Sequence, residues 1–251
     1  YVLGQNVTLF AFNNIDRVEV LRGPQGTLFG RNATGGLIHI ITKTPSHTPS
    51  GEVKLGYGNH QTYEGSFYGT TGLSETLAAD LSLYGRKRAN GFGYNTFLGT
   101  DVYKSEEYAV RGKLSWTPTD DTRVTLTADY LNQNSDIGLV RTLRRGVTGL
   151  DGRTQWNGVP RITSDNQDPK SIIWRASGVL KVEQDFSFAR FISITAYQSN
   201  RDKWILDSDG TPGFVLQSFT ADWNQGWTQE FQLQSNSDSV LQWVTGAKFL
   251  D

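Results

Sequence analysis

The residues of this sequence best suited to bind a ligand lie in a polar stretch between two predicted strands, at 134–170. From Arg141 to Arg161 this stretch holds several arginines but one acidic residue, Asp151. Arginine binds anionic groups through charge-assisted hydrogen bonds, and tryptophan stacks on planar ligands. The stretch is therefore a candidate ligand-binding loop, although a solvated loop has the same composition. Its candidate residues are Arg141, Arg144, Arg145 and Trp156.

Other side chains that could bind a metal ion or take part in catalysis do not form a recognisable site. His39, His47 and His60 are scattered without the spacing of metal ligands, so we predict no metal site. Asp207 to Gly210 repeats the start of a calcium loop without its remaining ligands, which favours an ordinary solvated loop. There is no Cys, and no nucleophile lies near a candidate base and a group to orient it. We therefore predict a protein that is not an enzyme and needs no cofactor.

A glycine-rich run at 23–36 also fails as a nucleotide site. It lacks the G-K-[ST] ending of a phosphate-binding loop and the G-x-G-x-x-G of a dinucleotide site. The formal net charge is −1, so no basic field favours nucleic acid as a partner.

The elements that position these residues are strands with one apolar and one polar face. In the segment 122–131, Val124, Leu126 and Ala128 alternate with arginine and threonine. Successive side chains of a strand point to opposite faces, so this segment has one apolar side. About nine segments follow the same pattern. They are 51–58, 61–71, 75–86, 106–117, 122–133, 171–183, 186–199, 226–236 and 239–250.

The connections between these strands alternate between short and long. Short turns fall near 72–74, 118–121, 184–185 and 237–238, and the long links are 87–105, 134–170 and 200–225. Ten-residue strands joined in this way are typical of outer-membrane barrels, whose short turns lie on the periplasmic side.

A soluble β-sandwich also has strands with one apolar face, but two features favour the membrane barrel. The polar face repeatedly carries charged residues, as a water-filled lumen would, and the apolar face is almost free of charge. Aromatic residues near strand ends (Trp116, Tyr130, Trp174 and Trp227) suit an interfacial girdle. Arg190 is the exception, because it falls among Phe188, Ile192 and Ile194; it lies near an interface or the predicted register is wrong there.

The N-terminal segment has a different pattern. A short strand at 15–21 ends in the turn signal Gly23-Pro24, and a second strand covers 37–42. A short helix or loop at 27–32 separates them. The polar, proline-containing stretch 43–50 then predicts a domain boundary, which divides the chain into 1–45 and 46–251.

Residues 15–45, IDRVEVLRGPQGTLFGRNATGGLIHIITKTP, resemble the end of the plug domain of TonB-dependent outer-membrane receptors. The QEFQLQS segment at 229–235 is similar to a barrel strand of the same family. The resemblance implies a plug remnant of α+β type at 1–45, followed by the N-terminal part of a transmembrane antiparallel β-barrel at 46–251. The plug-motif residues are Gly23, Pro24, Gly30, Gly35 and Gly36.

The resemblance also implies an ion pair between the plug and the barrel wall. An arginine at the position of Arg22 pairs in the family with glutamates of the wall, and Glu230 occupies one of the expected positions. The alternation independently places Glu230 on the polar face, opposite to Trp227 and Phe231. A local pair between Arg22 and Glu19 is the simpler alternative.

What the resemblance implies about function is active uptake of a scarce solute across a bacterial outer membrane. A ferric siderophore is the first expectation; an oligosaccharide, cobalamin or, in another class, an adhesin or carbohydrate-binding β-protein are alternatives. The implied partners are TonB, acting through an N-terminal segment that we expect to be missing, and outer-membrane lipid and lipopolysaccharide. Because about nine strands cannot close a barrel of about 22, we expect the chain to be a fragment.

Overall fold

The chain folds into β-strands around one large sheet. The structure is a computed structural model, and it describes residues 14–24, 35–155, 158–236 and 241–251. These described residues contain a two-stranded, a three-stranded and a nine-stranded sheet, and they contain no α-helix. None of the described segments forms a helix of the length and apolarity needed to cross a membrane.

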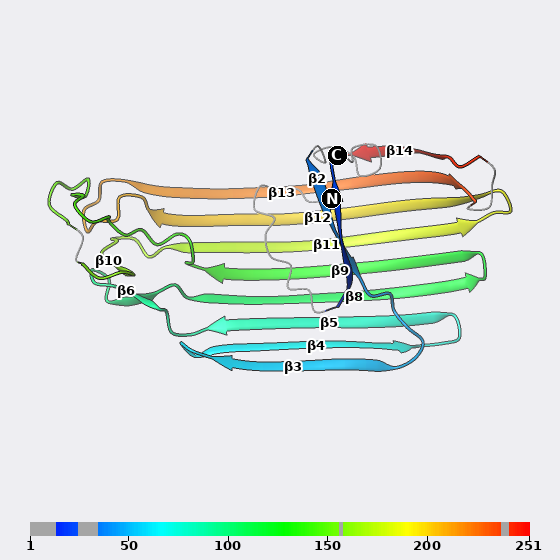
Figure 1. The fold of residues 1–251 in the computed structure, drawn as a ribbon, viewed down its shortest axis with the longest axis horizontal. Helices are drawn as coiled ribbons and strands as arrows, with labels where there is room; N and C mark the ends of the chain where they lie inside the picture. The colour runs from blue at the N-terminus through cyan, green and yellow to red at the C-terminus, as the bar shows by residue number, and fades with distance from the viewer. Residues whose placement is uncertain (1–13, 25–34, 156–157, 237–240) are drawn as a thin grey trace.

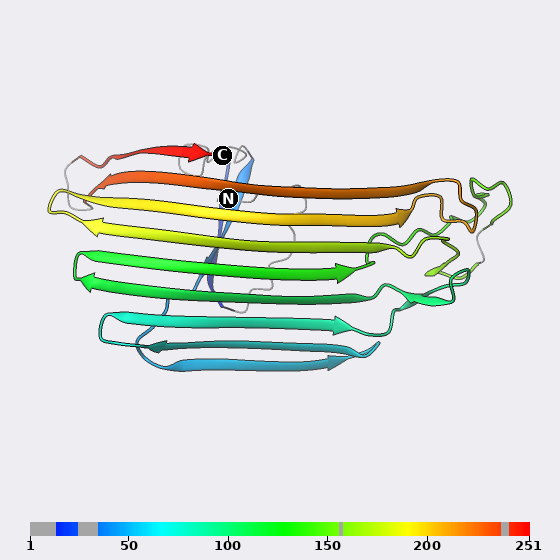
Figure 2. The ribbon, with the colours of Figure 1, turned by 180° about the vertical axis from the view of Figure 1, so that it is seen from behind.

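The nine-stranded sheet is an up-and-down meander (Figures 1 and 2) in the order β14-β13-β12-β11-β9-β8-β5-β4-β3, and each pair of neighbours is antiparallel. Its strands are β3 (Ser50–Gly58), β4 (Thr62–Gly72), β5 (Leu77–Arg88), β8 (Ser105–Thr119), β9 (Thr122–Ser135), β11 (Lys170–Asp185), β12 (Ala189–Asp207), β13 (Gln217–Ser235) and β14 (Val244–Leu250). The nine predicted strands are thus confirmed. The sheet stays open, with β3 and β14 at its edges.

The predicted long link at 200–225 is mostly strand. β12 continues to Asp207 and β13 begins at Gln217, and these two residues pair across the sheet. Beyond the bilayer a strand has water on both faces, so it needs no apolar face and its sequence loses the alternation that reveals it. The other two long links contain three short strands that the pattern did not predict: β6 (Gly93–Asn95), β7 (Thr100–Val102) and β10 (Ile162–Thr163).

The two faces of the sheet differ as the alternation predicts. We call the face crossed by the β1–β2 hairpin the inner face and the opposite one the outer face. The inner face carries charged and polar side chains such as Lys113, Asp129 and Arg175. On the outer face Leu55 is 86% exposed and Phe249 64% exposed. In water such an apolar surface would be unfavourable, whereas contact with lipid would stabilise it.

The register of β12 differs from the expectation at its beginning. Arg190 lies on the inner face with Ile192 and Ile194, because Glu183 and Lys181 of β11 pair with these two isoleucines. Arg190 Nη2 donates to Asp185 Oδ2 at 2.8 Å at the edge of the turn. The predicted register was therefore wrong here, since apolar residues occupy both faces of this strand and conceal its parity.

Aromatic side chains form two levels on the outer face. Phe191 and Phe231 stack near the short turns with 6.2 Å between ring centroids. Closer to the loops, Tyr130 contacts Trp174 at 6.1 Å and Tyr197 contacts Trp227 at 4.8 Å. Two such levels are what an apolar band between two membrane interfaces requires.

The hairpin of β1 (Ile15–Arg22) and β2 (Gly36–Thr42) runs across the strands of the large sheet rather than along them (Figure 1). Arg22 pairs with Gly36 at its closed end. Gly36 has φ +140°, and a Cβ there would lie 2.7 Å from the Leu21 carbonyl oxygen. Glycine is therefore required at this position of the plug motif.

Candidate functional site

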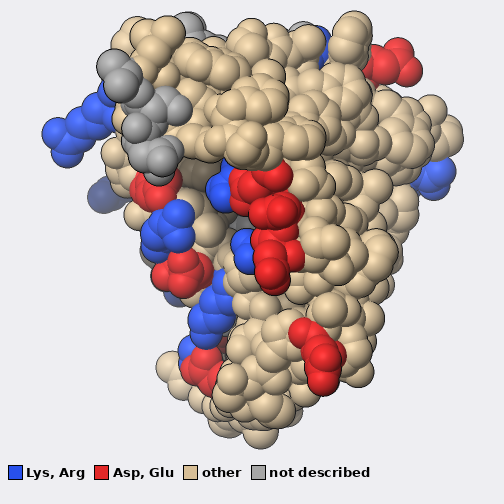
Figure 3. Space-filling view, turned by 90° about the vertical axis from the view of Figure 1, so that its right-hand side faces the viewer, with Lys and Arg blue, Asp and Glu red and all other residues tan. Residues whose placement is uncertain are grey.

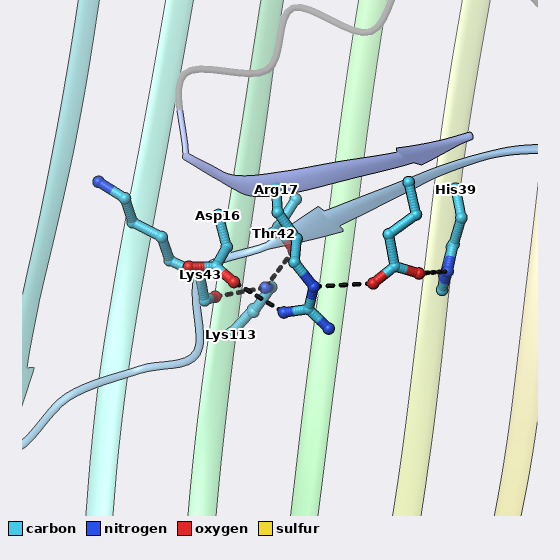
Figure 4. Close-up of polar contacts among 7 residues, drawn as sticks. Asp16, Arg17, His39, Thr42, Lys43 and Lys113 are labelled. Carbon is cyan, nitrogen blue, oxygen red and sulfur yellow. Dashed lines mark hydrogen bonds and ion pairs between the residues drawn. The ribbon is translucent and has the colours of Figure 1, made fainter. Parts of the chain in front are cut away.

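The hairpin contacts the inner face of the sheet at the end of β2, where the side chain of Lys113 binds it. The Lys113 side chain points from β8 to the hairpin (Figure 4) and donates to Thr42 Oγ1 and, at 2.7 Å, to the Lys43 carbonyl oxygen. Lys113 is buried, with 9% of its surface exposed, and its strand partner on the inner face is Asp80. A buried ammonium group is stable only when it is paired and hydrogen-bonded, so these contacts fix the end of the hairpin.

The residues that follow β2 are also bound to the sheet. Ser46 N donates to Thr70 Oγ1 at 2.8 Å, and Gly72 N donates to the His47 carbonyl oxygen at 3.2 Å. The Lys43 ammonium group lies 4.9 Å from the centre of the Tyr68 ring. We call the segment 42–47 the anchored linker, because contacts with β4 and β8 hold it along its length.

The hairpin itself carries a cluster of exposed charges. Arg17 donates to Glu19 at 2.8 Å and contacts Asp16 at 2.9 Å, and His39 lies 3.3 Å from the second Glu19 oxygen (Figure 4). The hydrogen bond from Arg17 is the main reason why the pKa of Glu19 lies below its ordinary value. Solvent-exposed pairs of this kind stabilise a fold only slightly.

The predicted pair joins Arg22, at the end of β1, with Glu230 on β13. Glu230 lies on the inner face, as predicted, with its side chain 14% exposed. Its Oε2 is 3.2 Å from Lys248 Nζ, and Gln232 Nε2 donates to its other oxygen. Arg22 is the last residue of β1, and the hairpin of β1 and β2 crosses the strands of the large sheet (Figure 1). An ion pair between them stays a prediction.

Above the hairpin, toward the long loops, the inner face lines an open hollow of about 880 Å³. Cationic, acidic and apolar side chains line it together, and they come from six strands and from the start of the link after β9. They include Arg86, Arg141, Glu107, Asp202, Asp222, Ile173, Trp204 and Leu206. Seen from the opposite, short-turn end, acidic and basic side chains likewise lie side by side along a hollowed side of the molecule (Figure 3).

Two acceptor atoms on the wall of this hollow are buried without a hydrogen-bond partner in the described part of the chain. They are Asp202 Oδ1 and Gln133 Oε1. A buried acceptor without a partner is unfavourable, so both atoms favour a donor from water or from a bound molecule. The wall thus combines free acceptors, two arginines and a tryptophan, a set that suits a large polar solute.

Of the candidate loop residues, the structure brings one to the hollow. Arg141 lines it, and its Nη1 donates to the Gly138 carbonyl oxygen at 3.2 Å. Arg144 and Arg145 are exposed on the loop and do not line the hollow. Trp156 and the plug-motif residue Gly30 lie outside the described residues.

A buried polar network holds Arg141 in place. Asp165 is fully buried; its Oδ2 accepts from Arg141 N at 3.3 Å, and its carbonyl oxygen accepts from Asn95 Nδ2 at 2.9 Å. Burial raises the pKa of the Asp165 carboxyl to about 6, although its hydrogen bonds from Thr163 and Arg141 oppose this shift. The network joins the link between β9 and β11 to the short strand β6. Composition alone did not indicate it.

The fragment of a calcium-loop pattern has a structural role in the same network. Asp207 Oδ1 accepts from Asp209 N at 2.9 Å and from Gly210 N at 3.1 Å, and its Oδ2 accepts from Asn166 N at 2.9 Å. The segment is therefore buried rather than solvated, which corrects the expectation. Among the described residues no group of three or more His, Cys, Asp or Glu side chains could hold a metal ion.

Trp204 and Trp223 both lie within the predicted long link at 200–225, and the structure places Trp204 on the wall of the hollow. Extending the alternation of β12 past Tyr197 would have placed Trp204 on the inner face. By the pairing of β12 with β13, Trp223 lies on the outer face. The signal was present, but the predicted end of the strand at residue 199 hid it.

Comparison with known proteins agrees with this architecture. The family model described as TonB-dependent Receptor Plug Domain matches residues 3–37. The chain is 34% identical over 127 residues to the ferrioxamine B receptor of Salmonella typhimurium. The aligned region covers 49% of this chain and 17% of the relative. It is 28% identical over 242 residues to the probable TonB-dependent receptor BfrD of Bordetella pertussis, covering 90% of this chain and 31% of the relative.

Among solved structures, the ferric yersiniabactin uptake receptor FyuA of Yersinia pestis has the same fold. Its TM-score is 0.75 at 23% identity, over 91% of this chain and 34% of that one. The chain is thus similar to part of a TonB-dependent outer-membrane receptor: residues 3–37 match the plug domain, and the large sheet shares the fold of the barrel wall. It spans about a sixth of the ferrioxamine B receptor, of which the match covers 17%.

Proposed function

We propose that the receptor takes up a ferric siderophore across the outer membrane. The observation that carries this proposal is the hollow above the hairpin, where Arg86, Arg141 and Trp204 meet free acceptors on the inner wall. Ferric siderophore complexes are large and polar, often anionic or aromatic, and such a wall offers them charge-assisted hydrogen bonds and stacking. The names of relatives as receptors for ferrioxamine and ferric yersiniabactin support the same ligand class.

In the proposed mechanism the solute binds in the hollow, and energy from TonB then rearranges the plug beneath it. TonB would act through a segment N-terminal to the described residues. The anchored linker favours a boundary between plug and barrel near residue 45, so the part that moves lies before it. The activity is transport without a catalytic step, and the outer face contacts outer-membrane lipid and lipopolysaccharide.

Uptake in cells tests this proposal. A strain that lacks its own siderophore receptors would express the full-length receptor and be supplied with ferrioxamine-type, catecholate and mixed-ligand siderophores loaded with radioactive iron. We expect saturable uptake of one class, which disappears when TonB is deleted. Uptake of cobalamin or an oligosaccharide, with no response to any siderophore, would contradict the proposed substrate. Uptake that persists without TonB would contradict the mechanism.

The candidate loop arginines should contribute unequally to siderophore binding, because they lie at different distances from the hollow. Arg141→Ala should weaken siderophore binding by about tenfold, because it removes a charge-assisted contact from the wall of the hollow. Arg144→Ala with Arg145→Ala should weaken it less, because both side chains are exposed away from the hollow. Siderophore titrations of the purified receptor measure both effects. Affinity equal to that of wild type in both variants would exclude these arginines from ligand recognition.

A further inference from the structure

The outer face carries a small group of cations that neither the plug nor the hollow involves. On β11, β12 and β13, the exposed charged residues at outer positions are Lys170, Arg201 and Lys203, and all three are positive. These three strands lie side by side in the view of the outer face (Figure 2). On β5 and β8, which β9 separates from β11, Lys87 and Glu106 occupy outer positions at the same end of the sheet and pair with each other at 3.2 Å.

The height of these cations corresponds to one membrane interface. Arg201 follows Phe191 of the lower aromatic level by ten residues on the same strand. At about 3.3 Å per residue this is about 33 Å along the strand. With a strand tilt of about 40°, the separation along the membrane normal is about 25 Å, which equals the height of the apolar band of such barrels. Arg201 therefore lies at the boundary of the outer leaflet, on the side of the long loops.

Aromatic rings hold the two cations of β12 on this surface. The Arg201 guanidinium carbon lies 4.5 Å from the centre of the Trp223 ring and 6.0 Å from that of Trp174. Lys203 Nζ lies 5.6 Å from the centre of the Phe219 ring. A stacked guanidinium keeps its N–H edge available for hydrogen bonds. Within the described residues, no carboxylate forms an ion pair with Arg201 or Lys203.

We propose that Arg201 and Lys203 bind a phosphate group of the phosphorylated glycolipid of the outer leaflet, the lipid part of lipopolysaccharide. Two residues apart on one strand, their Cα atoms are about 7 Å apart on the same face, so both side chains reach one phosphate. The acyl chains of the lipid then lie along the apolar positions below, among them Ala176 and Leu180. The proposal rests on the outer-membrane lipid contact of the proposed function and assigns residues to it.

The test uses the full-length receptor, extracted from outer membranes in mild detergent. Phosphorylated glycolipid that remains bound after washing is measured by mass spectrometry for wild type, for Arg201→Gln with Lys203→Gln, and for Lys87→Gln as the matched control. We expect the double variant to retain about tenfold less glycolipid, because two charge-assisted contacts are removed. The control should match wild type, since Lys87 lies in register with Lys203 across the sheet but pairs with Glu106.

A second arm adds purified glycolipid, with or without its phosphates, to receptor freed of lipid. Stronger binding of the phosphorylated form to wild type, lost in the double variant, supports the site. Equal binding of both forms, or equal retention by wild type and the double variant, overturns it. Siderophore binding is measured on the same samples, because the hollow lies on the opposite face. A double variant that binds siderophore is folded, and a receptor that binds no siderophore still gives a valid lipid comparison with its control.

Discussion

Reversing the charge of either Arg22 or Glu230 is expected to reduce siderophore uptake by about tenfold or more, and reversing both in one receptor is expected to restore most of it. The pairing would be a charge-assisted contact, worth about 1.5–3 kcal/mol. Arg22→Glu and Glu230→Arg each place like charges together, whereas the double variant restores opposite charges. Uptake of radioactive iron by cells, at equal receptor levels, measures the effect.

Lys248 provides the matched control for this experiment, because it lies 3.2 Å from Glu230. If the main ion-pair partner of Glu230 is Lys248, exchanging these two charges with Lys248→Glu and Glu230→Lys would restore uptake. The double variant Arg22→Glu with Glu230→Arg would then not restore it. No rescue by the Arg22 exchange, with rescue by the Lys248 exchange, would refute the pairing of plug and wall and leave Glu230 a residue of the wall alone.

Replacing Lys113 by methionine is expected to release the anchored linker. The substitution removes the donor to Thr42 and to the Lys43 carbonyl oxygen and leaves a buried acceptor without a partner, which costs about 1–3 kcal/mol. Amide hydrogen exchange at residues 42–47 should accelerate by about 10- to 100-fold in the full-length receptor, because the free energy of local opening falls by that amount.

Two other variants show whether faster hydrogen exchange results from the loss of the Lys113 hydrogen bonds. Lys113→Arg keeps a donor and should exchange nearly as slowly as wild type, and Thr42→Val removes one of the two acceptors and should have a smaller effect than Lys113→Met. If Lys113→Met leaves exchange at 42–47 unchanged, the linker is held by the contacts of Ser46 and His47 with β4 instead.

The strands that cross the membrane could be predicted because lipid on one side and water on the other impose a strict alternation. Val124, Leu126 and Ala128 follow it without exception, and so the strand, its faces and its neighbours were correct. The alternation fails where the surroundings of the two faces become alike. At Ile192 and Ile194 both faces carry apolar residues, and at residues 200–203 both faces carry polar residues.

The site was less predictable, because it depends on contacts between distant segments. Glu230 could be placed on the inner face by parity alone, whereas Lys113 gave no signal that it would meet residues 42 and 43. The burial of Asp165 and Asp207 likewise depends on loops folding over one another. Composition drew attention to Arg144 and Arg145, but Arg141 reaches the hollow because Asp165 and Gly138 hold it there.

The most direct measurement is ligand-dependent quenching of tryptophan fluorescence in the full-length receptor, solubilised in detergent and titrated with ferric and iron-free siderophores. Trp204 lines the hollow, so a bound ferric complex should quench its emission. The account predicts saturable quenching by one ferric siderophore, much weaker quenching by its iron-free form, and a reduced amplitude in Trp204→Phe. Quenching by cobalamin or an oligosaccharide, with none by any ferric siderophore, would contradict the proposed function.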